Sequence, residues 1–313
     1  MDDGAGDRVD GGQDAADGRA APAAGADDDP EAGRPAAASV RTVRTADGPV
    51  SVHVFPGVPV PRGVRRPVLV AFHGWTDSGE CFAPLAEALG RRWPVLAPDA
   101  PAHGGTRWEP AAEYVVADHA RGGVAVVDAA IRLAGRRGPV VVLGHSMGAL
   151  TAARVAAARP GVVRHLVLED PARTTMRRLR SSAARLAVLE RLQGMSDDAL
   201  RAEIAADAPG WPDDEYGPWV ASKRQVDLAH VAVPVDWGEP LAALLADVRC
   251  PVTLVRGDPA HGGIVSATGA RRCASVCPGG CDVVALPTGH NPRREARTRF
   301  VATLAATLGR HER

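Results

Sequence analysis

The sequence predicts an α/β fold in which a doubly wound, mostly parallel sheet carries a helical cap inserted between two strands. Three observations predict this class. Short, wholly apolar runs alternate with amphipathic or alanine-rich stretches, as buried parallel strands and their crossover helices require. One long interval, residues 171–249, breaks this rhythm with helical patterning alone. A serine between two glycines stands where one apolar run passes into a helix.

The N-terminal segment differs in composition from the rest of the chain. Residues 1–38 are mostly Ala, Gly, Asp and Pro and contain almost no large apolar side chains, so they predict a disordered acidic tail. Residues 1–39 hold ten acidic residues against three arginines, a net charge of −7, whereas the whole chain is formally neutral. The balancing positive charge forms no dense basic run, which argues against nucleic acid as the main partner.

The predicted core spans residues 39–170 and 250–313. It opens with two alternating segments, 39–45 and 50–55, which predict antiparallel strands joined at Asp47 and Gly48. The buried strands that follow are predicted at 67–72, 94–98, 139–144, 165–169, 251–255 and 281–287. Helices are predicted at 82–92, 114–135, 149–160 and 293–309. Right-handed crossovers place such helices on both faces of the sheet.

The interval 171–249 is too long for a simple crossover. It predicts helices over 176–193 and over 196–208, the second capped by Ser196. We interpret this interval as a helical cap over the C-terminal edge of the sheet, where open α/β sheets bind ligands.

The segment Gly144-His145-Ser146-Met147-Gly148 fits the pattern G-x-S-x-G, with a strand before it and a helix after it. Such a turn strains the serine backbone and brings neighbouring positions so close that side chains would clash, hence the glycines. Ser146 is therefore the predicted nucleophile. A tight turn that serves packing alone is the alternative.

Serine is a poor nucleophile near neutral pH and needs a base to accept its proton. His290 follows the last apolar run and precedes the last helix, so its loop returns to the edge where Ser146 lies. An imidazole in turn needs a carboxylate to fix its tautomer. Asp258 is the favoured acid because it follows the preceding strand, while Asp170 and Glu169, after the strand at 165–169, remain alternatives.

A tetrahedral oxyanion needs two convergent backbone donors. Met147 directly follows the serine and Trp75 lies just past an earlier strand, so both N–H groups are candidates. Substrate contacts are predicted for His145 and for Trp211 and Trp219 of the cap. These tryptophans, with Tyr216 and Trp237, form either an apolar pocket wall or the core of the cap itself.

These ordered motifs resemble the α/β-hydrolase fold superfamily, and in particular a serine esterase-like member with a helical cap. The resemblance covers about residues 40–310 and rests on HGW (73–75), PDAPAHGGT (98–106), GHSMGA (144–149), GD (257–258) and GH (289–290). It implies that Asp99 and His103 brace a loop near the site. Members usually carry the acid later in the loop after the strand-ending glycine, at the position of Ala260 here, so the loop is a variant one.

The remaining features of the sequence concern cofactors, metals, the cellular compartment and the partner. The sequence contains no glycine loop of the kind that binds a phosphate, so no cofactor is implied. Cys273, Cys277 and Cys281 lack a matching ligand set for a metal. An odd number of cysteines suits a reducing cytoplasm, and neither a signal peptide nor a membrane span is evident. The partner is predicted to be a small, apolar acyl compound. Neither its identity nor the oligomeric state follows from the sequence.

The leading hypothesis is a serine hydrolase that cleaves a carboxylic ester, lactone or related acyl bond through an acyl-enzyme on Ser146. A second hypothesis keeps the same residues for carbon–carbon bond hydrolysis or a cofactor-free elimination or cyclisation. A third is a non-catalytic ligand-binding protein on the same fold. The intact Ser146 and His290 argue against the third hypothesis, because a binding protein has no chemical need for both.

Overall fold

The computed structural model describes residues 37–134, 138–172, 178–179 and 183–312. The tail predicted over 1–38 lies outside the described residues except for its last two positions. Within the part that the structure describes, no helix is both long and apolar enough to cross a membrane.

A central sheet of eight strands runs in the order β1-β2-β4-β3-β6-β7-β10-β11. Its strands are β1 (Ser39–Thr45), β2 (Gly48–Phe55), β3 (Val68–Phe72), β4 (Val95–Pro98), β6 (Val140–His145), β7 (Val163–Glu169), β10 (Val252–Arg256) and β11 (Cys281–Ala285). β2 is antiparallel to β1 and to β4, and every other neighbouring pair is parallel. The predicted fold class, the strands at the apolar runs and the hairpin at Asp47-Gly48 are confirmed.

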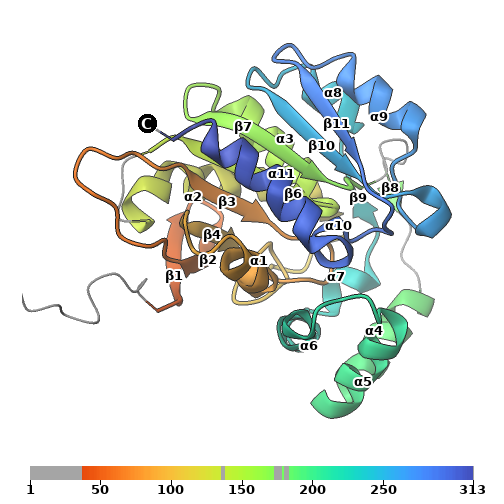
Figure 1. Cartoon of the computed structure of the whole chain (residues 1–313). Helices are drawn as coiled ribbons and strands as arrows, with labels where there is room; N and C mark the ends of the chain where they lie inside the picture. Colours follow the sequence, from red (N-terminus) through yellow and green to blue (C-terminus); the bar gives the residue numbers. More distant parts are fainter. Residues whose placement is uncertain (1–36, 135–137, 173–177, 180–182, 313) are drawn as a thin grey trace, which may run out of the picture. The chain divides into compact units, whose positions relative to one another are not determined.

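Helices cover both faces of this sheet (Figure 1). They are α1 (Ala83–Ala88), α2 (His119–Leu133), α3 (Met147–Ala158), α8 (Leu241–Leu245), α9 (Ala267–Ala274), α10 (Pro292–Glu295) and α11 (Arg297–Gly309), with short 3-10 turns at Gly79–Phe82, Val116–Asp118 and Pro259–His261. Alternate strand residues face opposite sides. Leu69 and Leu143 pack with α1 and α11, whereas Val70 and Val142 pack with α2 and α3. Burial on both faces explains the continuous apolar runs.

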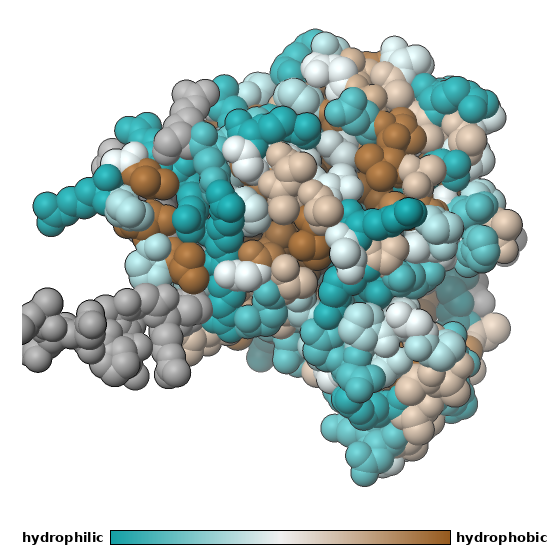
Figure 2. Space-filling view, in the orientation of Figure 1, coloured by the Kyte–Doolittle hydropathy of each residue, from teal (hydrophilic) through white to brown (hydrophobic). Residues whose placement is uncertain are grey.

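The segment between β7 and β10 is largely helical. It contains α4 (Ala183–Gly194), α5 (Asp197–Asp207), a 3-10 turn (Asp213–Glu215), α6 (Tyr216–Arg224) and α7 (Ala229–Ala232). Ser196 caps α5 as predicted, since its side chain accepts the Ala199 N–H at 3.2 Å. On the face seen in Figure 2, α4 and α5 show teal and pale colours rather than the brown of strongly hydrophobic residues.

A small second sheet corrects two predicted helix boundaries. β5 (Tyr114–Val115), β9 (Val235–Asp236) and β8 (Arg178–Leu179) pair in that order. The helix predicted over 114–135 therefore begins only at His119, and the helix predicted over 176–193 is described over Ala183–Gly194, with Arg178–Leu179 in a strand. Pairing with β9, which is distant in the sequence, overrides the local helical pattern at both places.

Candidate active site

Ser146 stands in the turn between β6 and α3 with a backbone φ of +50°, a region that non-glycine residues rarely adopt. Its N–H donates to the Glu169 carbonyl at 3.0 Å, which ties the turn to the end of β7. A Cβ at Gly144 would lie 2.3 Å from the Gly148 carbonyl oxygen, and one at Gly148 would lie 2.2 Å from that of Phe72. The glycines are thus a steric requirement of this turn, as the sequence predicts.

A line of hydrogen bonds joins Ser146, His290 and Asp170. The His290 Nε2 lies 2.9 Å from the Ser146 Oγ, and its Nδ1 lies 2.7 Å from the Asp170 Oδ2. With Nδ1–H donating to the carboxylate, Nε2 is left to accept the serine proton. His290 lies in the loop between β11 and α10 and its side chain remains 30% exposed, so a ligand can approach it.

The Asp170 carboxylate is buried and held by backbone donors. Asp170 directly follows β7 with a φ of +35°, and its N–H donates to the Val255 carbonyl at 2.8 Å. The N–H groups of Gly257 and Ile264 donate to Oδ1 at 3.2 Å and to Oδ2 at 2.9 Å. These bonds orient the carboxylate towards His290 and compensate for its burial.

Asp258, the favoured acid of the sequence analysis, does not make the predicted contact with His290. Its carboxylate accepts the Ala260 N–H at 3.0 Å and so caps the turn Pro259–His261. The carboxylate also lies 3.7 Å from the His261 Nδ1, and the Asp258 side chain is 47% exposed. An aspartate before proline forms a turn here, which is a common role for this pair. The contact belongs instead to Asp170, one of the two alternatives.

Glu169, the other alternative acid, is bound elsewhere. Its Oε1 accepts the Arg293 N–H at 2.7 Å and its Oε2 accepts a guanidinium N–H of Arg293 at 3.1 Å. Both side chains are buried. Glu169 therefore anchors the start of α10, three residues beyond His290, and does not contact the imidazole.

Each of the two predicted oxyanion donors has a backbone N–H group that is not already used in a hydrogen bond within the described chain. Within the described part of the chain, the backbone N–H groups of Trp75 and Met147 have no hydrogen-bonded acceptor. Met147 is the first residue of α3, so its N–H also lies at the positive end of the helix dipole. A Cβ at Gly74 would lie 2.6 Å from the His145 Nδ1. Glycine is thus needed for the Trp75 loop to approach the turn at Ser146.

A pocket of about 550 Å³ lies over Ser146 and His290. Its apolar lining comes mainly from Trp75, Ala172, Val188, Leu189, Leu192, Trp211, Trp219, Trp237 and Ile264. Its polar lining is Thr76, Asp77, His145, Lys223, Asn291 and Arg294. The predicted contact residues His145, Trp211 and Trp219 all line it, as does Trp237. Tyr216 does not, because its hydroxyl bonds the carbonyls of Ala208 and Trp211 within the helical segment.

His145 supports the loop that carries His290. Its Nε2 lies 2.9 Å from the His290 carbonyl oxygen, and the two rings lie 4.9 Å apart. Burial lowers the pKa of His145 well below its usual value, and the charge of Arg293 lowers it further. The imidazole is therefore neutral and donates its Nε2–H to that carbonyl.

Sequence reasoning missed a buried charge network beside the pocket. Asp77 Oδ2 accepts from Arg293 at 3.0 Å and from Arg294 at 3.2 Å, and its Oδ1 lies 3.6 Å from the Lys223 Nζ. Arg294 also donates to Glu215 at 3.1 Å. Burial opposes ionisation of Asp77, but the charges of Arg294, Lys223 and Arg293 outweigh it and hold the pKa well below the usual range.

Two signals in the sequence were available for this network. Lys223 is the only lysine of the chain, and two arginines follow directly after the loop of His290. The network joins α6 and the turn Asp213–Glu215 to the core beside His290.

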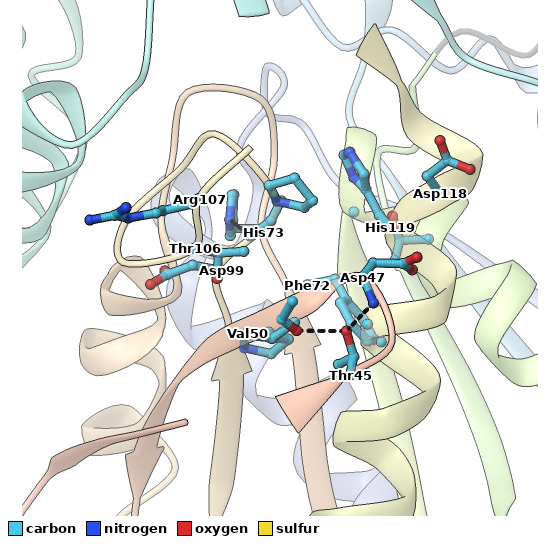
Figure 3. A pocket seen from close by; sticks show the side chains of 18 of the residues that line it. Thr45, Asp47, Val50, Phe72, His73, Asp99, Thr106, Arg107, Asp118 and His119 are labelled. Atoms are coloured by element: carbon cyan, nitrogen blue, oxygen red, sulfur yellow. Dashed lines mark hydrogen bonds between the residues drawn. The ribbon is translucent and has the colours of Figure 1, made fainter. Parts of the chain in front are cut away.

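A second cavity, of about 70 Å³, is lined by residues that include Asp99 and His119 (Figure 3). Met147, Gly148 and Thr151 of α3 also line it. Both ring nitrogens of His119 lack a hydrogen-bond partner among the described residues, and burial lowers its pKa to about 3. Neither Ser146 nor His290 lines this cavity. The larger pocket is therefore the candidate active site.

Asp99 and His103 hold backbone near that site. Asp99 accepts the N–H groups of Gly79 at 2.7 Å and Gly105 at 2.9 Å, and His103 accepts the Thr76 N–H at 3.1 Å. Over the described ranges, no three His, Cys, Asp or Glu side chains are placed to hold a metal ion, and all five cysteines are free thiols.

The model of the alpha/beta hydrolase family matches residues 68–303, which is most of the chain and includes every residue of the hydrogen-bonded line. The chain belongs to this family. Among solved structures, E-2-(acetamidomethylene)succinate hydrolase superposes with a TM-score of 0.63 at 22% identity, covering 86% of this chain and 98% of that one. At this identity the likeness shows the shared fold alone.

Two curated relatives match over shorter segments. Lipase LipV of Mycobacterium tuberculosis is 38% identical over 112 residues, which are 36% of this chain and 39% of the relative. Pimeloyl-[acyl-carrier protein] methyl ester esterase of Xanthomonas oryzae pv. oryzae is 36% identical over 99 residues, 31% of this chain and 34% of the relative. The chain thus matches less than half of the length of either relative.

Proposed function

We propose that the protein hydrolyses a carboxylic ester, lactone or related acyl bond through an acyl-enzyme on Ser146. The observation that carries this proposal is the hydrogen-bonded line from Ser146 through His290 to Asp170. His290 Nε2 accepts the hydroxyl proton as the serine Oγ attacks the acyl carbon, and then returns this proton to the leaving alcohol. Water, activated by His290, releases the acid and restores the serine.

In this proposal Asp170 takes the role that the sequence analysis gave to Asp258. The buried carboxylate fixes the Nδ1–H tautomer of His290 and stabilises the imidazolium that forms during each proton transfer. The N–H groups of Trp75 and Met147 stabilise the oxyanion, because both are free of other acceptors in the described chain. Removal of one such donor typically costs on the order of a hundredfold in kcat.

The rest of the molecule forms a core and a cap in this proposal. Residues 39–170 and 250–313 form the hydrolase core, and residues 171–249 form a cap that supplies Trp211 and Trp219 to the pocket wall, apart from α8, which packs with the core. The largely apolar lining favours an apolar acyl compound as substrate. The names of both curated relatives, a lipase and a methyl ester esterase, support ester hydrolysis. Free thiols at all five cysteines favour a reducing compartment, such as the cytoplasm.

Replacement of Ser146 by alanine tests this function directly. Hydrolysis of p-nitrophenyl acetate by the purified Ser146→Ala variant should fall to the level of buffer. The matched control is Ser275→Ala, an exposed serine outside the pocket, which should retain full activity. A fluorophosphonate should label the wild type on the peptide that contains Ser146. Turnover retained by Ser146→Ala, or a label on another residue, would overturn the proposal.

A further inference from the structure

A second apolar pocket adjoins the candidate active site beneath α4. It has a volume of about 370 Å³ and is lined by Trp75, Thr76, Ala184, Arg185, Val188, Leu189 and Val231. We call it the α4 groove. Four of these residues, Trp75, Thr76, Val188 and Leu189, also line the pocket over Ser146. The groove therefore continues the active-site pocket past the Trp75 side chain and along one face of α4.

We propose that the α4 groove binds the distal part of an unbranched acyl chain whose carbonyl carbon lies at Ser146, so that the substrates are medium- to long-chain acyl esters. This inference rests on the proposed function and names its substrate class. The occupant is aliphatic because the lining side chains are apolar apart from Thr76 and Arg185. An alkyl chain gains free energy from such a surface, whereas a polar group would lose its hydration there.

The arrangement of the pocket assigns the groove to the acyl side rather than to the alcohol. The leaving oxygen must lie within reach of His290, which protonates it. Asn291 and Arg294, which follow His290 in the chain, give that side of the pocket its polar lining. The groove instead begins at Trp75, whose N–H is a proposed oxyanion donor. The chain attached to the carbonyl carbon can thus pass Trp75 and reach α4.

The wall between the pocket and the groove is held in place. Trp75 donates its Nε1–H to the His230 Nε2 at 2.6 Å, and its ring packs edge-on against Trp237 at 6.1 Å. The Arg185 guanidinium lies 5.5 Å from the centre of the Trp75 ring. Since the indole is fixed at three points, the α4 groove exists before a substrate binds, and little conformational entropy is lost when the groove is filled.

Chain length provides the first test. Each methylene that moves from water into an apolar channel contributes about 0.8 kcal/mol, which is about fourfold in kcat/KM. We therefore expect kcat/KM of the wild type to rise steadily along the p-nitrophenyl ester series from acetate through butyrate, hexanoate and octanoate to decanoate. Lengthening the alcohol instead, from ethyl acetate to decyl acetate, should give a much smaller rise.

A matched pair of variants on α4 tests whether the dependence of kcat/KM on chain length arises in the α4 groove. Ala184 and Ala183 are neighbouring, exposed residues of the helix, but only Ala184 lines the groove. The bulky side chain of Ala184→Trp should displace at least two methylenes. The ratio of kcat/KM for decanoate to that for acetate should then fall by about tenfold or more. Ala183→Trp should leave this ratio at the wild-type value.

A binding measurement separates failure of this inference from failure of the proposed function. Calorimetric titration of the Ser146→Ala variant with decanoate and with butyrate reports on the channel without any turnover. Decanoate should bind more tightly, and Ala184→Trp introduced into that variant should abolish the difference. Equal binding of the two acids, a flat chain-length series in an active enzyme, or an equal effect of Ala183→Trp and Ala184→Trp would overturn the inference. Tight decanoate binding without hydrolysis of any ester would support the groove while refuting the proposed function.

Discussion

The ends of β7 and β10 are neighbours in the sheet, and an aspartate follows each of them. Asp170 comes directly after β7 and turns with a positive φ, so that its carboxylate meets His290 at 2.7 Å. Asp258 follows β10 after Gly257, with an extended backbone, and its carboxylate caps the next turn. Both residues share one edge of the sheet, but only the direction of the backbone at Asp170 brings an acid to the imidazole.

The two carboxylates also differ in their surroundings. Asp170 is buried and accepts hydrogen bonds from two backbone N–H groups besides His290. The Asp258 side chain is 47% exposed and accepts one from its own turn. A carboxylate that must stabilise an imidazolium repeatedly needs a fixed position, which the first environment provides and the second does not.

Replacement of Asp170 by asparagine should have the largest effect. The amide can no longer fix the Nδ1–H tautomer of His290 or stabilise its charged form, so kcat for a short ester should fall by about 10⁴-fold. The measurement is steady-state hydrolysis of p-nitrophenyl acetate, with thermal unfolding as the check that the variant folds. A loss of less than tenfold in a folded variant would remove Asp170 from the proposed mechanism.

Glu169, one residue earlier on β7, should affect stability instead. In Glu169→Gln the buried Arg293 loses one of its two carboxylate partners, which should cost about 3 kcal/mol in the free energy of unfolding. Asp214→Asn is the matched control, because it removes a partner of the more exposed Arg297 and should cost less than about 1 kcal/mol. Urea unfolding measures both, and equal effects would contradict the description of Glu169 as a buried anchor.

The pH dependence of stability should depend on His145, which pairs with Glu169 across β6 and β7. Burial lowers its pKa in the folded protein, so the unfolded chain binds a proton below about pH 6.5 that the folded chain does not. The free energy of unfolding should therefore fall as the pH decreases below this value, by at most about 1.4 kcal/mol per unit for this residue. His145→Asn should reduce the slope measured by urea unfolding from pH 8 to 5; an unchanged slope would show that His145 is charged when folded.

Asp258→Asn should have the smallest effect. The variant retains a side-chain oxygen that can cap the turn Pro259–His261, and the residue does not contact His290. We expect kcat and KM for the short ester to stay within about twofold of the wild type, and the stability to change by less than about 0.5 kcal/mol. A loss comparable to that of Asp170→Asn would restore the assignment made from the sequence.

Most of the fold could be predicted from the sequence, because strands that are buried on both faces of the sheet are continuous apolar runs. β3 and β6 are examples, and the glycines around Ser146 are a steric requirement of its turn. Ser146 and His290 could also be predicted, since each follows a strand at the same edge. The partner of His290 could not be, because Asp170 and Asp258 both follow strands and only the backbone conformation distinguishes them.

The charge network and the small sheet could not be predicted, because both form between segments that are distant in the sequence. Asp77 and Arg293 are 216 positions apart, and their pairing becomes visible only when the chain has folded. β5 and β8 are strands only because β9 lies between them. Local pattern carries no information on such contacts between distant segments. Lys223, as the only lysine, and the two arginines after the loop of His290 were the local hints.

The protonation of the two His290 ring nitrogens shows which carboxylate binds the imidazole. The ¹⁵N chemical shifts of labelled histidine distinguish a protonated ring nitrogen from an unprotonated one. We predict that at neutral pH His290 in the wild type and in Asp258→Asn carries its proton on Nδ1, with an exchange-protected N–H resonance, and that Asp170→Asn loses this resonance. Loss of the resonance in Asp258→Asn and its retention in Asp170→Asn would show that Asp258, and not Asp170, is the partner of His290.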